Sequence, residues 1–224
     1  SVWVRFGIIE TRFMMETIGK ASNDRNVCRN NGPNARKLPD RWLDYDPVGK
    51  PVKGTRFVPF KTPLSTDFFT NRGKDFGSDD VFDVKALLGY ASAHGKEIGL
   101  VIDLTATEKY YDPCEWTDRG IEYVKIRCSG HSAHTQTDGV RHFFDVVTAY
   151  LNRNANNDKL VGVHCTHGVN RTGYLICRYL IEVEGWAASA AIKQFEYCRG
   201  YRIEREEYLT SLYGGCEQRL LIAD

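Results

Sequence analysis

The stretch "KLVGVHCTHGVNRTGYLICRYLIEVEG", residues 159–185, constrains the fold more than any other part of the chain. Residues 159–165 are typical of a buried strand, and they end in a His-Cys pair. A short loop that contains Gly168 follows, and the segment 170–185 is predicted to be a helix. This helix is apolar on nearly every side, so it has to be buried. The core is therefore predicted to form around one strand, one tight loop and one central helix.

Strands and helices alternate through the rest of the sequence. Apolar runs and alternating patterns predict strands over 55–60, 98–104 and 121–127. In the last of these, Ile121, Tyr123 and Lys125 are expected on one face. Helical periods predict helices over 78–95, 138–154, about 187–198 and 206–217. The first of these helices is expected to start at the capping signal Ser-Asp-Asp and to stop at Gly95. The alternation predicts an α/β domain with a mostly parallel central sheet flanked by helices.

The chain divides into three parts by composition. Residues 1–37 are predicted to be a flexible N-terminal extension, since 21–37 are polar, rich in Asn and without period. Residues 38–217 have the mixture of apolar and polar segments that is typical of one globular domain, and 218–224 are predicted to be a C-terminal tail.

Charge and cysteine content narrow the class of protein. The net charge of +1 creates no overall field toward nucleic acid or membranes, so an anionic ligand needs a local cluster of cations. The seven cysteines include no C-x-x-C pair, which argues against a disulfide framework or zinc ribbon and favours a reducing compartment. No apolar run reaches ~18 residues, and the first twenty residues carry several charges, so neither a membrane span nor a signal peptide is expected.

The loop between Cys165 and Arg171 has the residues for phosphate chemistry. Backbone N–H groups at a strand–loop–helix junction form a nest for an anion, and the helix dipole adds positive charge. Arg171 supplies a planar fork for two phosphate oxygens, and the same field lowers the pKa of the Cys165 thiol. A thiolate beneath a bound phosphate is a nucleophile aimed at phosphorus.

Each of these residues also has a plainer interpretation. Cys165 would otherwise be a small core residue, as Cys177 is expected to be. His164 is a metal ligand or, on the interpretation we favour, a hydrogen-bonded residue that orients the loop. His167 either points to solvent or touches the ligand, and Thr172 binds the sulfur, caps the helix, or does both.

The motif "HCTHGVNRTG" resembles the H-C-x5-R-[ST] signature of the cysteine phosphatase superfamily. It is most similar to the RNA 5′-triphosphatase branch, which includes the amino-terminal domain of metazoan mRNA capping enzymes and stand-alone RNA 5′-phosphatases. The likeness covers about 38–213 and extends to "LPDRWLDYDPVG", "GTRFVPFKTPL", "GLVIDLTATEKYYD", the Gly-His of "CSGH" and "RGYRIEREEYL". It implies a cysteine-phosphatase fold and the removal of γ and β phosphates from RNA 5′ ends, without metal or cofactor. The RNA 5′ end is the implied partner, with RNA-processing or RNA-silencing proteins beside it, in the nucleus, the cytoplasm or both.

The resemblance also assigns roles to residues. Cys165 matches the nucleophile and Arg171 the phosphate-binding arginine, while Asp103 matches a family aspartate near the loop. Asp103 either assists catalysis or only holds Arg171 or loop backbone. The residues expected to bind substrate are Thr166, His167, Gly168, Val169, Asn170, Thr172, Arg205 and Lys61.

A general acid is the missing part of the pattern. Protein phosphatases commonly carry an acidic Asp some thirty residues before the cysteine, but Asp138 in that region is expected to begin a helix. A phosphoanhydride releases a weakly basic phosphate oxygen, which needs less proton donation. A dual-specificity protein phosphatase and an inactive phosphate-binding adaptor remain the alternatives. Arg199, Arg202 and Arg205 are expected to form a basic cluster, and a polyphosphate ligand favours a binding role for Arg205 and Lys61 only.

Overall fold

The computed structural model describes residues 36–70, 76–128 and 137–220. The extension predicted to be flexible falls outside these ranges up to residue 35, and so does the Gly-His of "CSGH". Of the predicted tail, residues 218–220 belong to the last helix, and 221–224 lie outside the description.

A four-stranded parallel sheet forms the centre of the domain, as the alternation of elements predicts. Its strands are β1 (Phe57–Lys61), β2 (Ile98–Asp103), β3 (Glu122–Lys125) and β4 (Leu160–Cys165), in the order β1-β4-β2-β3. Because the strands are parallel, their carboxyl ends share one edge, where Lys61 pairs with Cys165 and Asp103 with His164. Ligands of open α/β sheets bind outside this edge.

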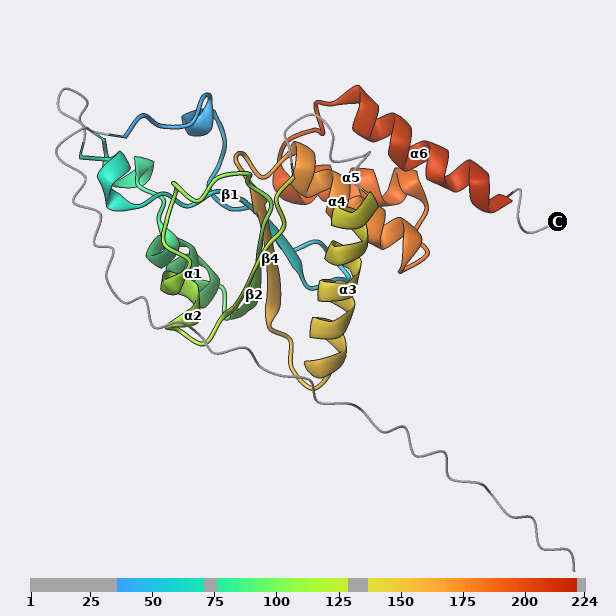
Figure 1. Cartoon of the computed structure of the whole chain (residues 1–224), viewed down its shortest axis with the longest axis horizontal. Coiled ribbons are helices and arrows are strands. Elements are labelled where there is room, and N and C mark those ends of the chain that lie inside the picture. The colour runs from blue at the N-terminus through green and yellow to red at the C-terminus, as the bar shows by residue number, and fades with distance from the viewer. Residues whose placement is uncertain (1–35, 71–75, 129–136, 221–224) are drawn as a thin grey trace, which may run out of the picture. The chain divides into compact units, whose positions relative to one another are not determined.

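Helices cover both faces of the sheet (Figure 1). The short helices η1 (Trp42–Asp44), η2 (Thr66–Phe68) and η3 (Ser78–Asp80) lie with α1 (Val84–Ala93) and α2 (Cys114–Thr117) ahead of β3 in the chain. The opposite layer consists of α3 (Thr137–Arg153), α4 (Asn170–Glu182), α5 (Ala188–Arg199) and α6 (Glu206–Leu220). Two apolar clusters result, one on each face, and α4 is the most deeply buried of these helices, as its sequence predicts.

One predicted boundary is wrong. The helix predicted from residue 78 begins at Val84, because Ser78–Asp80 form a separate short turn and Asp83 caps α1 by accepting the amide N–H of Ala86 at 2.7 Å. The helix predicted over 138–154 is confirmed as α3, with Asp138 in its first turn as expected. Within the described ranges, no helix has the length and apolar character needed to cross a bilayer.

Candidate active site

The loop between β4 and α4 has a backbone that only glycine permits. Gly168 has a φ of 68°, in the left-handed region, and a Cβ there would lie 2.1 Å from the carbonyl oxygen of Phe60. The loop is therefore pressed against the backbone of β1. Its amides can point inward around a common centre, where an anion would be held at the N-terminus of α4.

Cys165 lies at the base of this loop, and its side chain is buried. Burial alone would raise its pKa, but the charge of Arg171, the hydroxyl of Thr172 and the amides of Thr172 and Gly168 together hold the pKa below its ordinary value. The Thr172 hydroxyl is buried and has no hydrogen-bond partner of ordinary geometry among the described residues, so it is available to the sulfur. A thiolate is the form of cysteine that attacks phosphorus.

Arg171 projects from the first turn of α4 and is fixed by neutral acceptors. Its Nη1 donates to the carbonyls of Leu104 and Cys128, both at 3.0 Å, and its Nη2 donates to Thr166 Oγ1 at 3.1 Å. These contacts position the guanidinium without neutralising it. Its charge therefore acts on Cys165 and on any anion in the loop.

A second arginine, Arg199, holds the backbone of the loop, a role that no sequence pattern indicates. Arg199 is buried at the end of α5, where its Nε donates to Gly168 O at 3.1 Å and its Nη2 to His167 O at 2.9 Å and Asp46 O at 2.7 Å. Burial lowers its pKa. The predicted surface cluster with Arg202 and Arg205 is thus wrong for Arg199, because backbone carbonyls of the loop take up its guanidinium.

Lys61 is also buried beside the loop. Its Nζ donates to Tyr45 O at 2.8 Å and Trp42 O at 3.2 Å, and it lies 3.7 Å from the centre of the Trp42 ring. Burial, together with the charge of Arg199, lowers its pKa to about 8. The hydrogen bonds of the Lys61 ammonium therefore go to the segment 42–45, and Lys61 acts on an anion in the loop through its charge.

Asp103 is held by four donors, and Arg171 is not one of them. Its Oδ2 accepts from Lys125 Nζ at 2.8 Å and from the hydroxyls of Tyr111 and Tyr123 at 3.0 Å, and its Oδ1 accepts the Thr105 amide at 2.7 Å. Burial raises its pKa, but His164, Lys125 and the Thr105 amide outweigh that effect and lower it. An ionised carboxylate that already accepts four hydrogen bonds is a poor proton donor. Asp103 does not hold Arg171 either, because the guanidinium of Arg171 donates to Leu104, Cys128 and Thr166. Asp103 is a positioning residue.

His164 connects this buried network to the nucleophile. Its Nε2 lies 2.7 Å from Tyr111 Oη, and its Nδ1 lies 3.3 Å from the carbonyl oxygen of Cys165. The ring is fully buried, which lowers its pKa. The prediction that His164 is a hydrogen-bonded histidine is confirmed. Tyr111, which links it to Asp103, was missed because a tyrosine in a loop carries no distinctive pattern.

The rim of the loop is closed by a polar network around Glu204. Its carboxylate accepts from Asn170 Nδ2 at 3.1 Å, Tyr45 Oη at 2.9 Å and Arg41 Nη2 at 3.2 Å, and Asn170 Oδ1 accepts the Glu204 amide at 2.8 Å. The ring of His167 stacks on Tyr45 at 4.7 Å. Asn170 and His167 are thus held at the rim by residues from distant parts of the chain.

The remaining predicted residues lie around the same loop. Val169 is buried as the N-cap residue of α4, and Thr166 is half-buried. Arg205 follows Glu204 directly and donates to Glu207 at 3.3 Å. Among the described residues, no three His, Cys, Asp or Glu side chains gather as a metal site would require.

A thiolate in an anion-binding loop, at the carboxyl edge of a parallel sheet and beneath a fixed arginine, defines a cysteine-dependent phosphatase. The family described as "Dual specificity phosphatase, catalytic domain" matches residues 84–216, and the chain belongs to this family. Within it, the RNA/RNP complex-1-interacting phosphatase homolog of Caenorhabditis elegans is 52% identical over 178 residues, which are 80% of this chain and 76% of that protein.

A mammalian relative supports the same assignment, and a solved structure supports the fold. The RNA/RNP complex-1-interacting phosphatase of Bos taurus is 44% identical over 80% of this chain, and the match spans 52% of that protein, about half its length. The crystal structure of Tk-PTP, at 17% identity, superimposes with a TM-score of 0.55 over 79% of this chain and 97% of its own. That similarity concerns the fold alone.

Proposed function

We propose that the protein is an RNA 5′-polyphosphatase. It removes the γ and β phosphates from 5′-triphosphate or 5′-diphosphate RNA ends and leaves a 5′-monophosphate. The observation that carries this proposal is the Cys165 thiolate in an amide-lined loop beneath Arg171. The names of the nematode and cattle relatives, which refer to an RNA/RNP complex, support RNA as the carrier of the phosphate.

The reaction runs in two displacements at phosphorus. The Cys165 sulfur attacks the terminal phosphorus, an S–P bond forms, and the P–O bond to the bridging oxygen breaks, which leaves the shortened RNA end with that oxygen. Water then attacks the phosphocysteine and releases inorganic phosphate and the thiolate. Arg171 and the loop amides stabilise the charge on the transferring phosphoryl group in both steps.

The ionised state of Asp103 fits a phosphoanhydride substrate. Asp103 is committed to Lys125, Tyr111, Tyr123 and Thr105, so it does not protonate a leaving group. A phosphate oxygen departs as a weak base and gains little from an acid, whereas the alkoxide of a serine phosphomonoester gains much. The last phosphate on an RNA end is bonded to such an alkoxide, which is why the monophosphate is the end product.

The RNA 5′ end is the proposed partner, together with proteins of RNA processing or RNA silencing. The proposed location is the nucleus, the cytoplasm or both, since an unbridged thiolate nucleophile needs a reducing compartment. The described cysteines are all free thiols, in keeping with such a compartment.

The experiment compares phosphate release from 5′-triphosphate RNA and from a phosphotyrosine peptide, both without added metal. The wild-type chain should favour the RNA end by kcat/KM. Cys165→Ser should still bind the RNA end and lose turnover by several orders of magnitude, because a serine hydroxyl is not ionised here. Cys114→Ser, at an exposed cysteine, is the control and should be as active as wild type.

Three outcomes would contradict the proposal. Activity of Cys165→Ser within about tenfold of wild type would exclude the phosphocysteine. A higher kcat/KM on the phosphopeptide would favour the protein phosphatase, and binding without turnover by the wild-type chain would favour the adaptor.

A further inference from the structure

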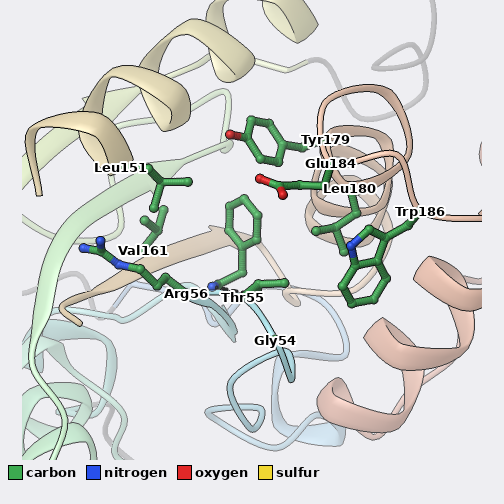
Figure 2. A pocket seen from close by; sticks show the side chains of 10 residues that line it. Gly54, Thr55, Arg56, Leu151, Val161, Tyr179, Leu180, Glu184 and Trp186 are labelled. Carbon is green, nitrogen blue, oxygen red and sulfur yellow. Dashed lines mark hydrogen bonds between the residues drawn. The ribbon is translucent and has the colours of Figure 1, made fainter. Parts of the chain in front are cut away.

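A cavity lies at the edge of the sheet opposite Cys165 (Figure 2). Phe57 and Val161 line it, and they stand at or near the amino ends of β1 and β4, whereas Cys165 stands at the carboxyl end of β4. Its volume is about 270 Å³. A ligand here would therefore leave the phosphate-binding loop free.

The interior of this cavity is apolar and rich in aromatic side chains. Phe57, Val161 and Leu180 are core residues that form its floor, and Tyr179 and Trp186 form part of its wall. The remaining lining residues are Gly54, Thr55, Arg56, Leu151 and Glu184. Such a surface favours a flat or aliphatic group over a strongly hydrated one.

The one acidic group of the lining is Glu184, which Figure 2 shows with its carboxylate pointing between Tyr179 and Leu151 into the cavity. Its side chain forms no ion pair with a basic side chain among the described residues. Its charge reaches the phenol beside it: burial raises the pKa of Tyr179, the Thr148 hydroxyl opposes this, and Glu184 raises it further. The cavity thus combines aromatic faces with an unneutralised negative charge.

Arg56 lines the same cavity but does not neutralise Glu184. Its Nε donates to Lys159 O at 2.7 Å, its Nη1 to Asn154 O at 2.8 Å and its Nη2 to Asn157 Oδ1 at 3.2 Å. Figure 2 shows its guanidinium directed away from Glu184. Glu184 is exposed to solvent, so its carboxylate is accessible to a positively charged group of an occupant.

We propose that this cavity docks an arginine side chain presented by a partner protein. The aliphatic stem of the arginine contacts Phe57 and Leu180, its guanidinium stacks on Trp186, and its N–H groups bind Glu184. The volume lies at or below the lower limit for drug-sized ligands, and it suits one side chain better than a nucleotide. The Glu184 carboxylate binds the guanidinium of an arginine and repels a phosphate at the same position, which favours a protein partner over RNA there.

The test uses the folded chain and three probes: acetyl-Gly-Arg-Gly-amide, the same peptide with neutral citrulline in place of arginine, and a short single-stranded RNA. NMR follows the indole N–H of Trp186, one of four tryptophans, identified by its loss in Trp186→Phe. The arginine peptide should shift this signal in a saturable way. Citrulline, or the variant Glu184→Gln, should weaken binding by about tenfold or more, the usual effect of losing a charge-assisted hydrogen bond.

The matched control is Asp118→Asn, which removes an exposed carboxylate beside α2, on the other face of the sheet. It should bind the arginine peptide as wild type does. Hydrolysis of an aryl phosphate should be unchanged at saturating peptide, since Cys165 lies at the opposite edge. Equal binding of the two peptides, unchanged affinity in Glu184→Gln, or a larger shift with RNA would each overturn the proposal.

Discussion

Replacement of Gly168 by alanine tests whether the shape of the phosphate loop depends on close backbone contact. The added Cβ would lie 2.1 Å from Phe60 O and 2.4 Å from Phe60 C, where ordinary contacts begin at 3.4 Å. The loop must therefore move away from β1 by roughly 1 Å. A displacement of about 1 Å in a catalytic group typically costs about 100-fold in rate, and we expect kcat/KM on an aryl phosphate to fall by about that factor.

Gly95→Ala is a closely matched control. Gly95 has a φ of 64°, nearly that of Gly168, but a Cβ there would meet no atom within 4 Å. Both variants carry the cost of a left-handed alanine, about 1–2 kcal/mol of unfolding free energy, and only Gly168→Ala adds a collision. Gly95→Ala should therefore keep full activity. If Gly168→Ala retained more than about a third of wild-type kcat/KM, the close contact with β1 would not determine the loop geometry.

Three further predictions concern the buried network, metal and substrate length. Asp103→Asn leaves Lys125 without its buried partner and should lower the unfolding free energy by about 3–5 kcal/mol at neutral pH. Folding lowers the pKa of Asp103, so the extra unfolding free energy of the wild type over Asp103→Asn should be fully present above the unfolded-state pKa of about 3.9. It should be lost as the pH falls through the pKa of Asp103 in the folded protein. Acid unfolding of both proteins measures this difference. Activity should be unchanged by EDTA, because Arg171 and loop amides bind the phosphate; loss restored by Mg²⁺ would indicate another class of triphosphatase. Arg205→Ala should reduce kcat/KM on triphosphate RNA by about 10- to 150-fold and affect a small aryl phosphate less, and equal losses would contradict a contact with the phosphate chain.

The secondary structure follows largely from local patterns. Apolar runs predict the strands because both faces of a parallel sheet are covered, and β4 and α4 match their predicted positions closely. The start of α1 was missed because Ser78, Asp79, Asp80 and Asp83 are all good capping residues, and packing of Phe82 and Val84 into the core decides among them.

Some residues of the site can be predicted from local sequence patterns, and others depend on contacts between distant parts of the chain. Cys165 and Arg171 were predictable because one loop holds both, and its strand–loop–helix context is local. Arg199 and Glu204 were not, because their partners lie far along the chain. The acceptors of Arg199 are backbone carbonyls, which every residue possesses, so no sequence pattern marks them.

The net charge of the chain is only +1, so the positive field of the anion site depends on which groups neutralise the nearby basic side chains and which do not. Lys125 pairs with the Asp103 carboxylate and contributes little field outside that pair. Arg171, Arg199 and Lys61 instead donate to neutral oxygens, chiefly backbone carbonyls, which fix their positions and leave their charges unbalanced.

Burial strengthens this field and also limits the pH range in which it acts. In a medium of low dielectric constant, each uncompensated charge acts more strongly on a bound phosphate than it would in water. The same desolvation lowers the pKa of Lys61 to about 8, so its share of the field declines as pH rises through that value. The carbonyl-held arginines keep their charge well above neutral pH, and attraction for phosphate should therefore weaken in alkali without disappearing.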